Sequence, residues 1–86
     1  MSILKVSIRQ VKAARALLGW SQEQLASAAG VSVPTVKRLE AADGEVGGRP
    51  ETSQKLLAAL ENAGIAFLQD GGGAGVKLRR RSAPSR

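Results

Sequence analysis

Residues 21–41 of the chain, SQEQLASAAGVSVPTVKRLEA, decide its fold. Ser21 and Gln24 form a Ser-x-x-Gln capping box, which is typical of a helix N-terminus. Gly30 stands where helices commonly end in a left-handed residue. The stretch therefore predicts two short helices joined by a tight turn, over about residues 22–29 and 33–41.

The turn and the second helix carry further signals. Ser32 is placed to cap the second helix, and Pro34 fits its first turn because the missing N–H would have no helical partner there. Ala26 is small enough for two helices to cross closely, and Gly30 lets the backbone turn sharply. Together these spacings indicate helix-turn-helix geometry, in which the second helix enters the major groove of DNA.

The flanking segments add two helices and a hairpin. Ser7 with Gln10 forms another capping box before an amphipathic stretch, and Pro50 opens the last helical stretch. After Gly64 the apolar period changes to alternation on either side of a Gly-rich loop, which predicts a β-hairpin. The expected elements are helices over about 8–18, 22–29, 33–41 and 51–63 and strands over about 65–69 and 76–80. They form one helix-turn-helix domain of residues 1–78, which is followed by a basic flexible tail, 79–86.

The composition excludes several classes of protein. The chain has 86 residues, no cysteine and no histidine, so disulfide frameworks, thiolate or imidazole metal sites and Cys or His catalysis are ruled out. Seven scattered carboxylates form no acid–base pair or metal constellation. The run of Gly71–Gly75 lacks the Gly-Lys-Ser/Thr sequence of a phosphate loop. We therefore expect no enzyme activity, no metal and no cofactor.

The charge distribution points to a polyanionic partner. The net charge is +6, and much of the positive charge lies near the C-terminus. Nucleic acid is the first candidate partner for such a chain, and an anionic membrane surface is the second. Alternatively, the basic C-terminus acts only as a solubilising tail. No apolar run reaches signal-peptide or membrane-spanning length, so a cytoplasmic protein is expected. Five of the positive charges fall in the last ten residues: Lys77, Arg79, Arg80, Arg81 and Arg86.

Residues 14–41, ARALLGWSQEQLASAAGVSVPTVKRLEA, resemble the phage-repressor, Xre-type helix-turn-helix family. The shared features are a Leu-Gly-hydrophobic-Ser-Gln stretch, a Gln-x-x-Leu-Ala scaffold helix, a Gly-Val-Ser turn and a recognition helix ending in Leu-Glu. The ending AGIAFLQDGGGAGVKLRR is similar to that of short bacterial members. The resemblance covers residues 8–63 and implies a mainly α, lambda-repressor-like fold with a C-terminal β-hairpin.

The resemblance also implies which residues would read DNA bases. Phage repressors place base-reading glutamines where this chain has Val33 and Pro34, and an apolar pair can only press on thymine methyl groups. Polar readout then falls to the residues that follow, with Arg38 assigned to guanine or, alternatively, to a phosphate. The expected base-reading residues are Val33, Pro34, Thr35, Lys37 and Arg38.

Other residues receive backbone-contacting or structural roles from the same resemblance. Gln22 and Ser32 are expected to contact phosphates, although each also has an ordinary structural reading as an exposed or capping residue. Arg49 follows the loop of residues 43–48, which should lie near the DNA backbone, and is expected to contact a phosphate or the minor groove. Arg15 and Glu40 match an Arg and a Glu of the family and are expected to form a partly buried ion pair. Trp20 precedes the cap of the second helix and is interpreted as a core residue.

The function expected from this reading is that of a DNA-binding transcriptional regulator, a repressor in the family's usual mode, acting as a homodimer on a two-fold operator. The alternative is a partner-binding module such as an antitoxin that sequesters a protein and regulates its own promoter. A peripheral membrane binder is disfavoured because the first helix has a small apolar side. The hairpin is expected to build a sheet across the dimer, which residues 3–6 of the same or the partner chain could extend. Alternatively, the hairpin folds back on the last helix of its own chain and the protein dimerises only on DNA. The expected interface residues are Ile65, Phe67, Leu68, Val76 and Leu78.

Overall fold

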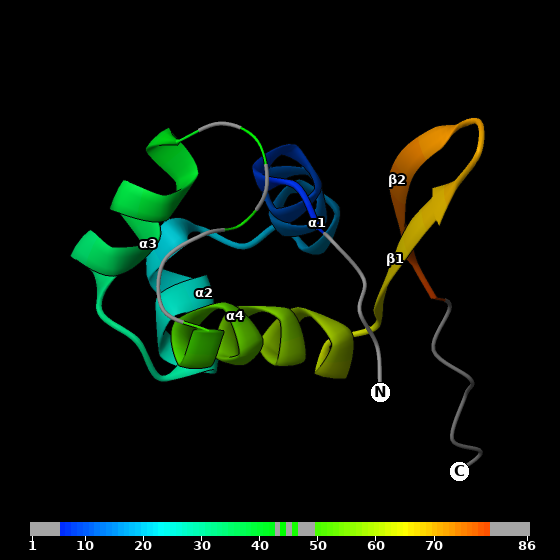
Figure 1. The fold of residues 1–86 in the computed structure, drawn as a ribbon. Helices are drawn as coiled ribbons and strands as arrows, with labels where there is room; N and C mark the ends of the chain where they lie inside the picture. The colour runs from blue at the N-terminus through cyan, green and yellow to red at the C-terminus, as the bar shows by residue number, and fades with distance from the viewer. Residues whose placement is uncertain (1–5, 43, 45, 47–49, 80–86) are drawn as a thin grey trace, which may run out of the picture.

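The computed structural model describes residues 6–42, 44, 46 and 50–79. Four helices are followed by a two-stranded antiparallel hairpin (Figure 1), so the fold class expected from the sequence is confirmed. The last helix begins and ends one residue earlier than expected. The elements are α1 Ile8–Leu18, α2 Gln22–Ala29, α3 Val33–Ala41, α4 Pro50–Asn62, β1 Ile65–Asp70 and β2 Gly73–Leu78.

Local capping interactions set the ends of the first helices. Ser7 and Gln10 form both hydrogen bonds of a capping box at α1, as do Ser21 and Gln24 at α2. Each box satisfies two backbone N–H groups that the helix itself leaves without partners. Gly30 ends α2 with a φ of 73°, a conformation that glycine adopts without steric cost.

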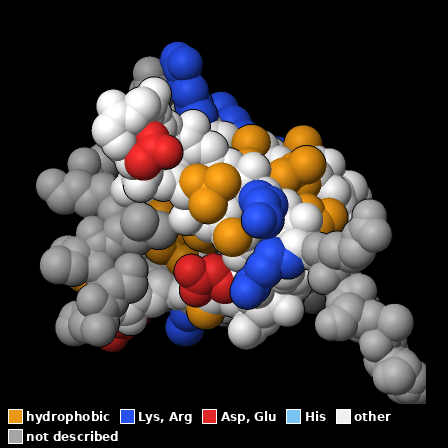
Figure 2. All heavy atoms as spheres, turned by 90° about the vertical axis from the view of Figure 1, so that its right-hand side faces the viewer, with side chains coloured by type: hydrophobic (Ala, Val, Ile, Leu, Met, Phe, Trp, Pro, Cys, Tyr) orange, Lys and Arg blue, Asp and Glu red, His pale blue; other side chains and the backbone are white. Residues whose placement is uncertain are grey.

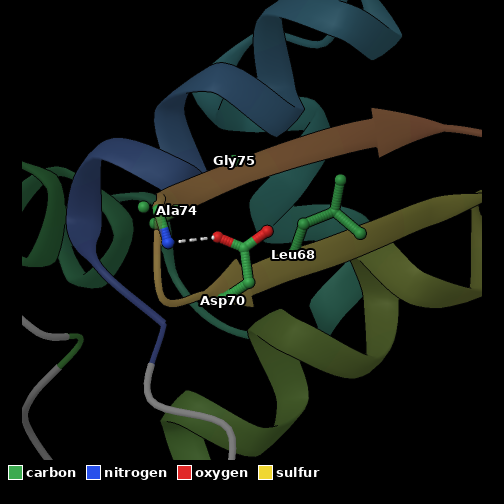
Figure 3. Close-up of a pocket in the computed structure, with 6 residues that line it drawn as sticks. Leu68, Asp70, Ala74 and Gly75 are labelled. Carbon is green, nitrogen blue, oxygen red and sulfur yellow. Dashed lines mark hydrogen bonds between the residues drawn. The ribbon is translucent and has the colours of Figure 1, made fainter.

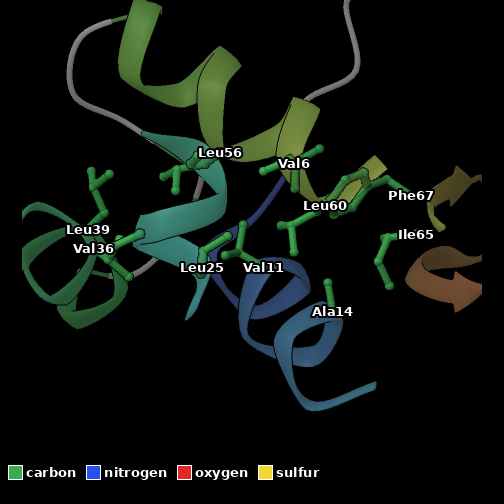
Figure 4. Packing of buried hydrophobic residues seen from close by; sticks show 13 residues of the cluster. Val6, Val11, Ala14, Leu25, Val36, Leu39, Leu56, Leu60, Ile65 and Phe67 are labelled. Carbon is green, nitrogen blue, oxygen red and sulfur yellow. The ribbon is translucent and has the colours of Figure 1, made fainter. Parts of the chain in front are cut away.

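The hydrophobic core runs through the whole molecule from α3 to the hairpin. Figure 4 shows Val36 and Leu39 of α3 at one end, Ile65 and Phe67 at the other, and Leu25 of α2 between them. Leu25, Val36 and Ile65 are completely buried. Because α3 and the hairpin pack on opposite sides of one core, they form opposite ends of the molecule (Figure 1).

The hairpin turn is tighter than the sequence suggested. Asp70 pairs with Gly73, so only two residues connect the strands. The first strand ends one residue later than the expected 69, whereas the second spans residues 73–78 and not the expected 76–80. The longer Gly-rich loop that the expected strands left between them is therefore wrong. The Asp70 carboxylate accepts a hydrogen bond of 2.7 Å from the backbone N–H of Gly72, which stabilises the tight turn. The second strand begins at Gly73 itself, whose φ of 147° is a conformation that favours glycine.

Gln10 anchors the hairpin to α1, a role that the sequence did not reveal. Its side chain is 4% exposed, and its Nε2 donates to the backbone oxygens of Leu68 at 3.2 Å and Gly75 at 2.9 Å. Its Oε1 accepts from the backbone N–H of Ser7. One amide therefore completes the cap of α1 and fixes both strands against that helix.

Replacing Gln10 with leucine should lower the free energy of unfolding by about 1–3 kcal/mol, because buried polar groups of the cap and hairpin would lose a partner. Urea unfolding would measure the loss, and hydrogen exchange should show faster exchange in the hairpin. Gln24→Leu is the matched control, since Gln24 holds the same capping-box position but is exposed. Equal losses in the two variants would contradict the anchoring role.

The backbone before α1 pairs with the connection between α3 and α4. The Val6 oxygen accepts from the N–H of Val46 at 2.9 Å, and the N–H of Ile8 donates to the oxygen of Gly44 at 2.8 Å. The Val6 side chain is 3% exposed within the core. The expectation that this segment extends the hairpin is therefore wrong at Val6, and residues 3–5 lie outside the described residues.

The hairpin folds back on its own helices, which corrects part of the expected dimer interface. Ile65 and Phe67 are 0% and 9% exposed, because they lie on the hairpin face that closes the core. They are therefore not available to a second copy. Val76 is half-buried against the same core, whereas Leu68 and Leu78 are exposed.

The basic C-terminal segment is described only at its first residue. Arg79 is exposed, and its backbone N–H donates to the Gly64 oxygen at 2.8 Å, closing the base of the hairpin. Residues 80–86, which include the other arginines of the expected tail, lie outside the described residues. Within the described part of the chain, no helix has the length and apolarity needed to cross a membrane.

Candidate nucleic-acid interface

Helix α3 turns one face to the core and the other to solvent. Val36, Leu39 and Glu40 are buried, whereas Lys37 and Arg38 are exposed. This division follows from the helical period, since residues three and four apart share a face. The exposed face is therefore positively charged, and no acidic residue precedes Glu40 in the helix.

Several side chains at the N-terminus of α3 are engaged within the protein, unlike those of Lys37 and Arg38. Ser32 caps the helix by accepting from the backbone N–H of Thr35 at 3.2 Å, and the two hydroxyl oxygens lie 2.7 Å apart. Val33 is half-buried and packs against the core, while Pro34 is exposed. Of the five residues expected to read bases, the structure thus exposes Pro34, Lys37 and Arg38 and half-buries the other two.

Arg15 of α1 and Glu40 of α3 lie in direct contact. The Nε of Arg15 donates to Oε2 of Glu40 at 2.8 Å, and a terminal nitrogen donates to Oε1 at 2.9 Å. The two side chains are 21% and 5% exposed. The other terminal nitrogen of Arg15 donates to the backbone oxygen of Trp20 at 2.9 Å. This parallel two-bond arrangement is the strong form of an Arg–carboxylate pair.

Gln22 joins the same group of side chains, which no sequence signal indicated. Its Nε2 donates to Oε1 of Glu40 at 2.9 Å, so a single carboxylate links α1, α2 and α3. Gln22 is also the first residue of α2, where backbone N–H groups have no partner inside the helix. The expected phosphate-contacting residue is therefore held in place from the protein side by Glu40.

The environment of Glu40 favours its charged form. Burial alone would raise the pKa of this carboxyl, but hydrogen bonds from Arg15 and Gln22 and the charge of Arg15 together lower it below its ordinary value. Glu40 is thus ionised at neutral pH and balanced by the Arg15 guanidinium. The pair adds no net negative charge beside the basic face of α3.

Arg49, the third residue expected to contact phosphate, lies outside the described residues. It follows the α3–α4 connection, whose described residues Gly44 and Val46 bond to the segment before α1. The structure therefore brings Gln22 and Ser32 to the N-termini of α2 and α3 and leaves the place of Arg49 undescribed.

Comparison with known proteins agrees with this geometry. The sequence profile of the HTH_3 helix-turn-helix family, which is a DNA-binding family and not a family of enzymes, matches residues 11–63. No curated protein matches the chain. The matched region is more than half of the chain and contains α2, α3, α4, the Arg15–Glu40 pair and most of α1. The chain therefore belongs to the HTH_3 helix-turn-helix family of DNA-binding domains.

Proposed function

We propose that this protein is a sequence-specific transcriptional regulator that places α3 in the major groove of double-stranded DNA. The observation that carries the proposal is the exposed face of α3, on which Lys37 and Arg38 stand with no acidic neighbour before the buried Glu40. A helix serving only to pack would need no such face. Regulation by repression and a cytoplasmic location belong to the same proposal.

Sequence choice and affinity come from different residues in this proposal. Arg38 and Lys37 reach base edges, and Pro34 with Val33 and Thr35 lines the end of α3 that enters the groove. Contacts to the DNA backbone supply position and much of the affinity without sequence information. The proposed phosphate-contacting residues are Gln22, Ser32 and Arg49.

Glu40 supports the proposed phosphate contact by Gln22. Its carboxylate accepts one hydrogen of the Gln22 amide at 2.9 Å, which restricts the rotamers of that side chain. The second amide hydrogen then remains for a phosphate at the N-terminus of α2, where helix N–H groups favour an anion. The contact is preorganised, so less side-chain entropy is lost on binding.

Two copies acting together complete the proposal. One α3 reads only a few base pairs, so proteins of this design reach high specificity by binding two related half-sites. We propose a homodimer in which each copy reads one half-site. The basic segment from residue 79 onward adds non-specific attraction to DNA through counterion release.

Selection of bound duplexes from a random pool tests the function directly. We expect enrichment of a short motif and binding that weakens steeply as salt is raised. Lys55→Ala is a suitable control because Lys55 is an exposed cation on α4 and not on α3, and this variant should select the same motif. Binding without any enriched motif would contradict sequence-specific regulation.

A further inference from the structure

The positive charge of the described helices is concentrated on α1 and α3. Helix α1 carries three basic residues and no acidic one, and α3 carries two basic residues and the buried Glu40. Helices α2 and α4 each contain more acidic than basic residues. Because the Arg15–Glu40 pair joins α1 to α3, the basic residues of the two helices lie on adjoining elements.

The hairpin end of the molecule has no such excess of positive charge. Figure 2 views the molecule from this side and shows basic and acidic side chains interspersed with hydrophobic ones. A hollow of about 420 Å³ is lined there by Leu68, Asp70 and residues 72–75. The Asp70 carboxylate at this hollow (Figure 3) would repel a phosphate. A further contact with the DNA backbone is therefore to be sought on α1.

Lys12 lies on α1 one helical turn before Arg15. Residues three apart on a helix share a face, so Lys12 stands on the side of α1 from which Arg15 reaches Glu40 at 2.8 Å. Gln22 of α2 donates to the same carboxylate at 2.9 Å. Burial raises the pKa of that carboxyl, whereas its two hydrogen-bond donors, the charge of Arg15 and the charge of Lys12 lower it. Lys12 is thus within electrostatic range of the carboxylate that holds Gln22.

The charge of Lys12 has no partner in the described part of the chain. Its side chain is exposed, and no described carboxylate forms an ion pair with it. Glu40 already accepts from Arg15 through both of its oxygens. Since the charges of Arg15 and Glu40 cancel, the cluster around Glu40 keeps the one positive charge of Lys12.

We propose that Lys12 contacts the same DNA phosphate as Gln22, so that α1 is a third helix of the DNA-binding surface. Gln22 supplies the second hydrogen of its amide, and Lys12 supplies the charge. A lysine ammonium binds phosphate as a point charge on a flexible stem and does not need the two-bond geometry of arginine. The contact rests on the placement of α3 in the major groove proposed above.

Lys12 and Gln22 contribute to binding in ways that can be measured separately. A cation that neutralises a phosphate releases counterions, and each such contact adds about 0.9 to the slope of the logarithm of the binding constant against that of the salt concentration. A neutral amide releases none. Loss of the Lys12 charge should therefore lower the slope, whereas Gln22→Ala should weaken binding and leave the slope unchanged.

Band-shift titrations of the selected duplex at a series of salt concentrations test the contact. Lys12→Gln removes the charge, so the slope should fall by about 0.9 and the affinity at about 0.1 M salt roughly fivefold to tenfold. Lys12→Arg keeps the charge and should retain the slope. Lys77→Gln is the matched control and should change neither quantity, since Lys77 is an exposed lysine of the hairpin, at the opposite end of the molecule from α3 (Figure 1).

A shared phosphate also predicts that the two losses are not additive. Residues that hold the same group are energetically coupled, because removing one of them loosens the contact that the other makes. The double variant Lys12→Gln with Gln22→Ala should therefore lose less affinity than the product of the two single losses, by at least about twofold. Losses that multiply would assign the two residues to different phosphates and overturn the shared contact.

Three further results have a defined meaning. Equal slopes and affinities for Lys12→Gln and Lys77→Gln would overturn the proposal, as would a changed motif in Lys12→Gln, which would place Lys12 at a base. Urea unfolding of Lys12→Gln should match that of the wild type, and a loss of affinity explained by unfolding would also overturn it. A wild-type protein that binds no duplex would instead refute the proposed function itself.

Discussion

Replacing Arg15 with alanine should lower the free energy of unfolding by about 3 kcal/mol. Removing one partner of a buried ion pair typically costs about 3–5 kcal/mol, because the other charge stays buried without its counterion. Glu40 is 5% exposed and would be that charge, while the 21% exposure of Arg15 places the loss at the lower end. Urea unfolding followed by circular dichroism would measure it.

Two further variants show whether the loss comes from the pair. Lys12→Ala removes an exposed cation of the same helix that acts on Glu40 through its charge alone and should cost less than about 0.5 kcal/mol. Arg15→Lys keeps the charge but not the two parallel hydrogen bonds, so an intermediate loss is expected. If Arg15→Ala cost no more than Lys12→Ala, the pair would contribute nothing to stability.

The same pair sets the acid response of the fold. The folded pKa of Glu40 lies below its unfolded value, so the stabilisation is complete above the unfolded pKa, near 4.3, and is lost as the pH falls through the folded pKa. Glu40→Gln should therefore be less stable than the wild type at pH 7. The difference should shrink as the pH is lowered below about 4, which unfolding at a series of pH values would show.

Replacing Arg38 with alanine should weaken binding to the preferred DNA sequence by about 1–3 kcal/mol, or roughly 5-fold to 150-fold. In the proposed readout Arg38 donates two hydrogen bonds to one guanine, and the variant would lose both. The variant should also tolerate any base at that position of the motif. Band-shift titrations against the selected duplex and its single-base variants would measure both effects.

Gln22→Ala is the comparison that separates base readout from backbone contact. Gln22 is held by Glu40 at the N-terminus of α2, so its loss should weaken binding to all sequences alike and leave the motif unchanged. An unchanged motif in Arg38→Ala would instead assign Arg38 to the DNA backbone.

The helices were predictable because their signals are local. Ser21 and Gln24 lie three residues apart, and Gly30 marks the end of α2 through its own backbone preference. The hairpin was predictable only as an element. Its register depends on pairing between the strands, which no short motif encodes. The run of glycines at 71–73 did not show which two residues form the turn, whereas the structure locates it by the hydrogen bond from Gly72 to the Asp70 carboxylate.

The part of the candidate DNA-binding site that lies on α3 was predictable from the resemblance to the Xre-type family. The resemblance placed Lys37 and Arg38 among the base-reading residues, and the structure exposes both of them. The contacts of Gln10 with Leu68 and Gly75 join residues 58 and 65 positions apart, and that of Gln22 with Glu40 spans 18 positions. Such contacts arise from the packing of whole elements, so no short motif announces them.

Glu40 has a consequence for how this protein can diversify. The polar anchor of α3 lies on its buried face, whereas Pro34, Lys37 and Arg38 stand on the opposite, exposed face. Exposed substitutions away from caps and buried networks usually change stability by less than about 0.5 kcal/mol. Under the proposed readout, new DNA preferences can therefore be selected at these three positions while the scaffold stays unchanged. Duplicated copies could then diverge in target without passing through an unstable intermediate.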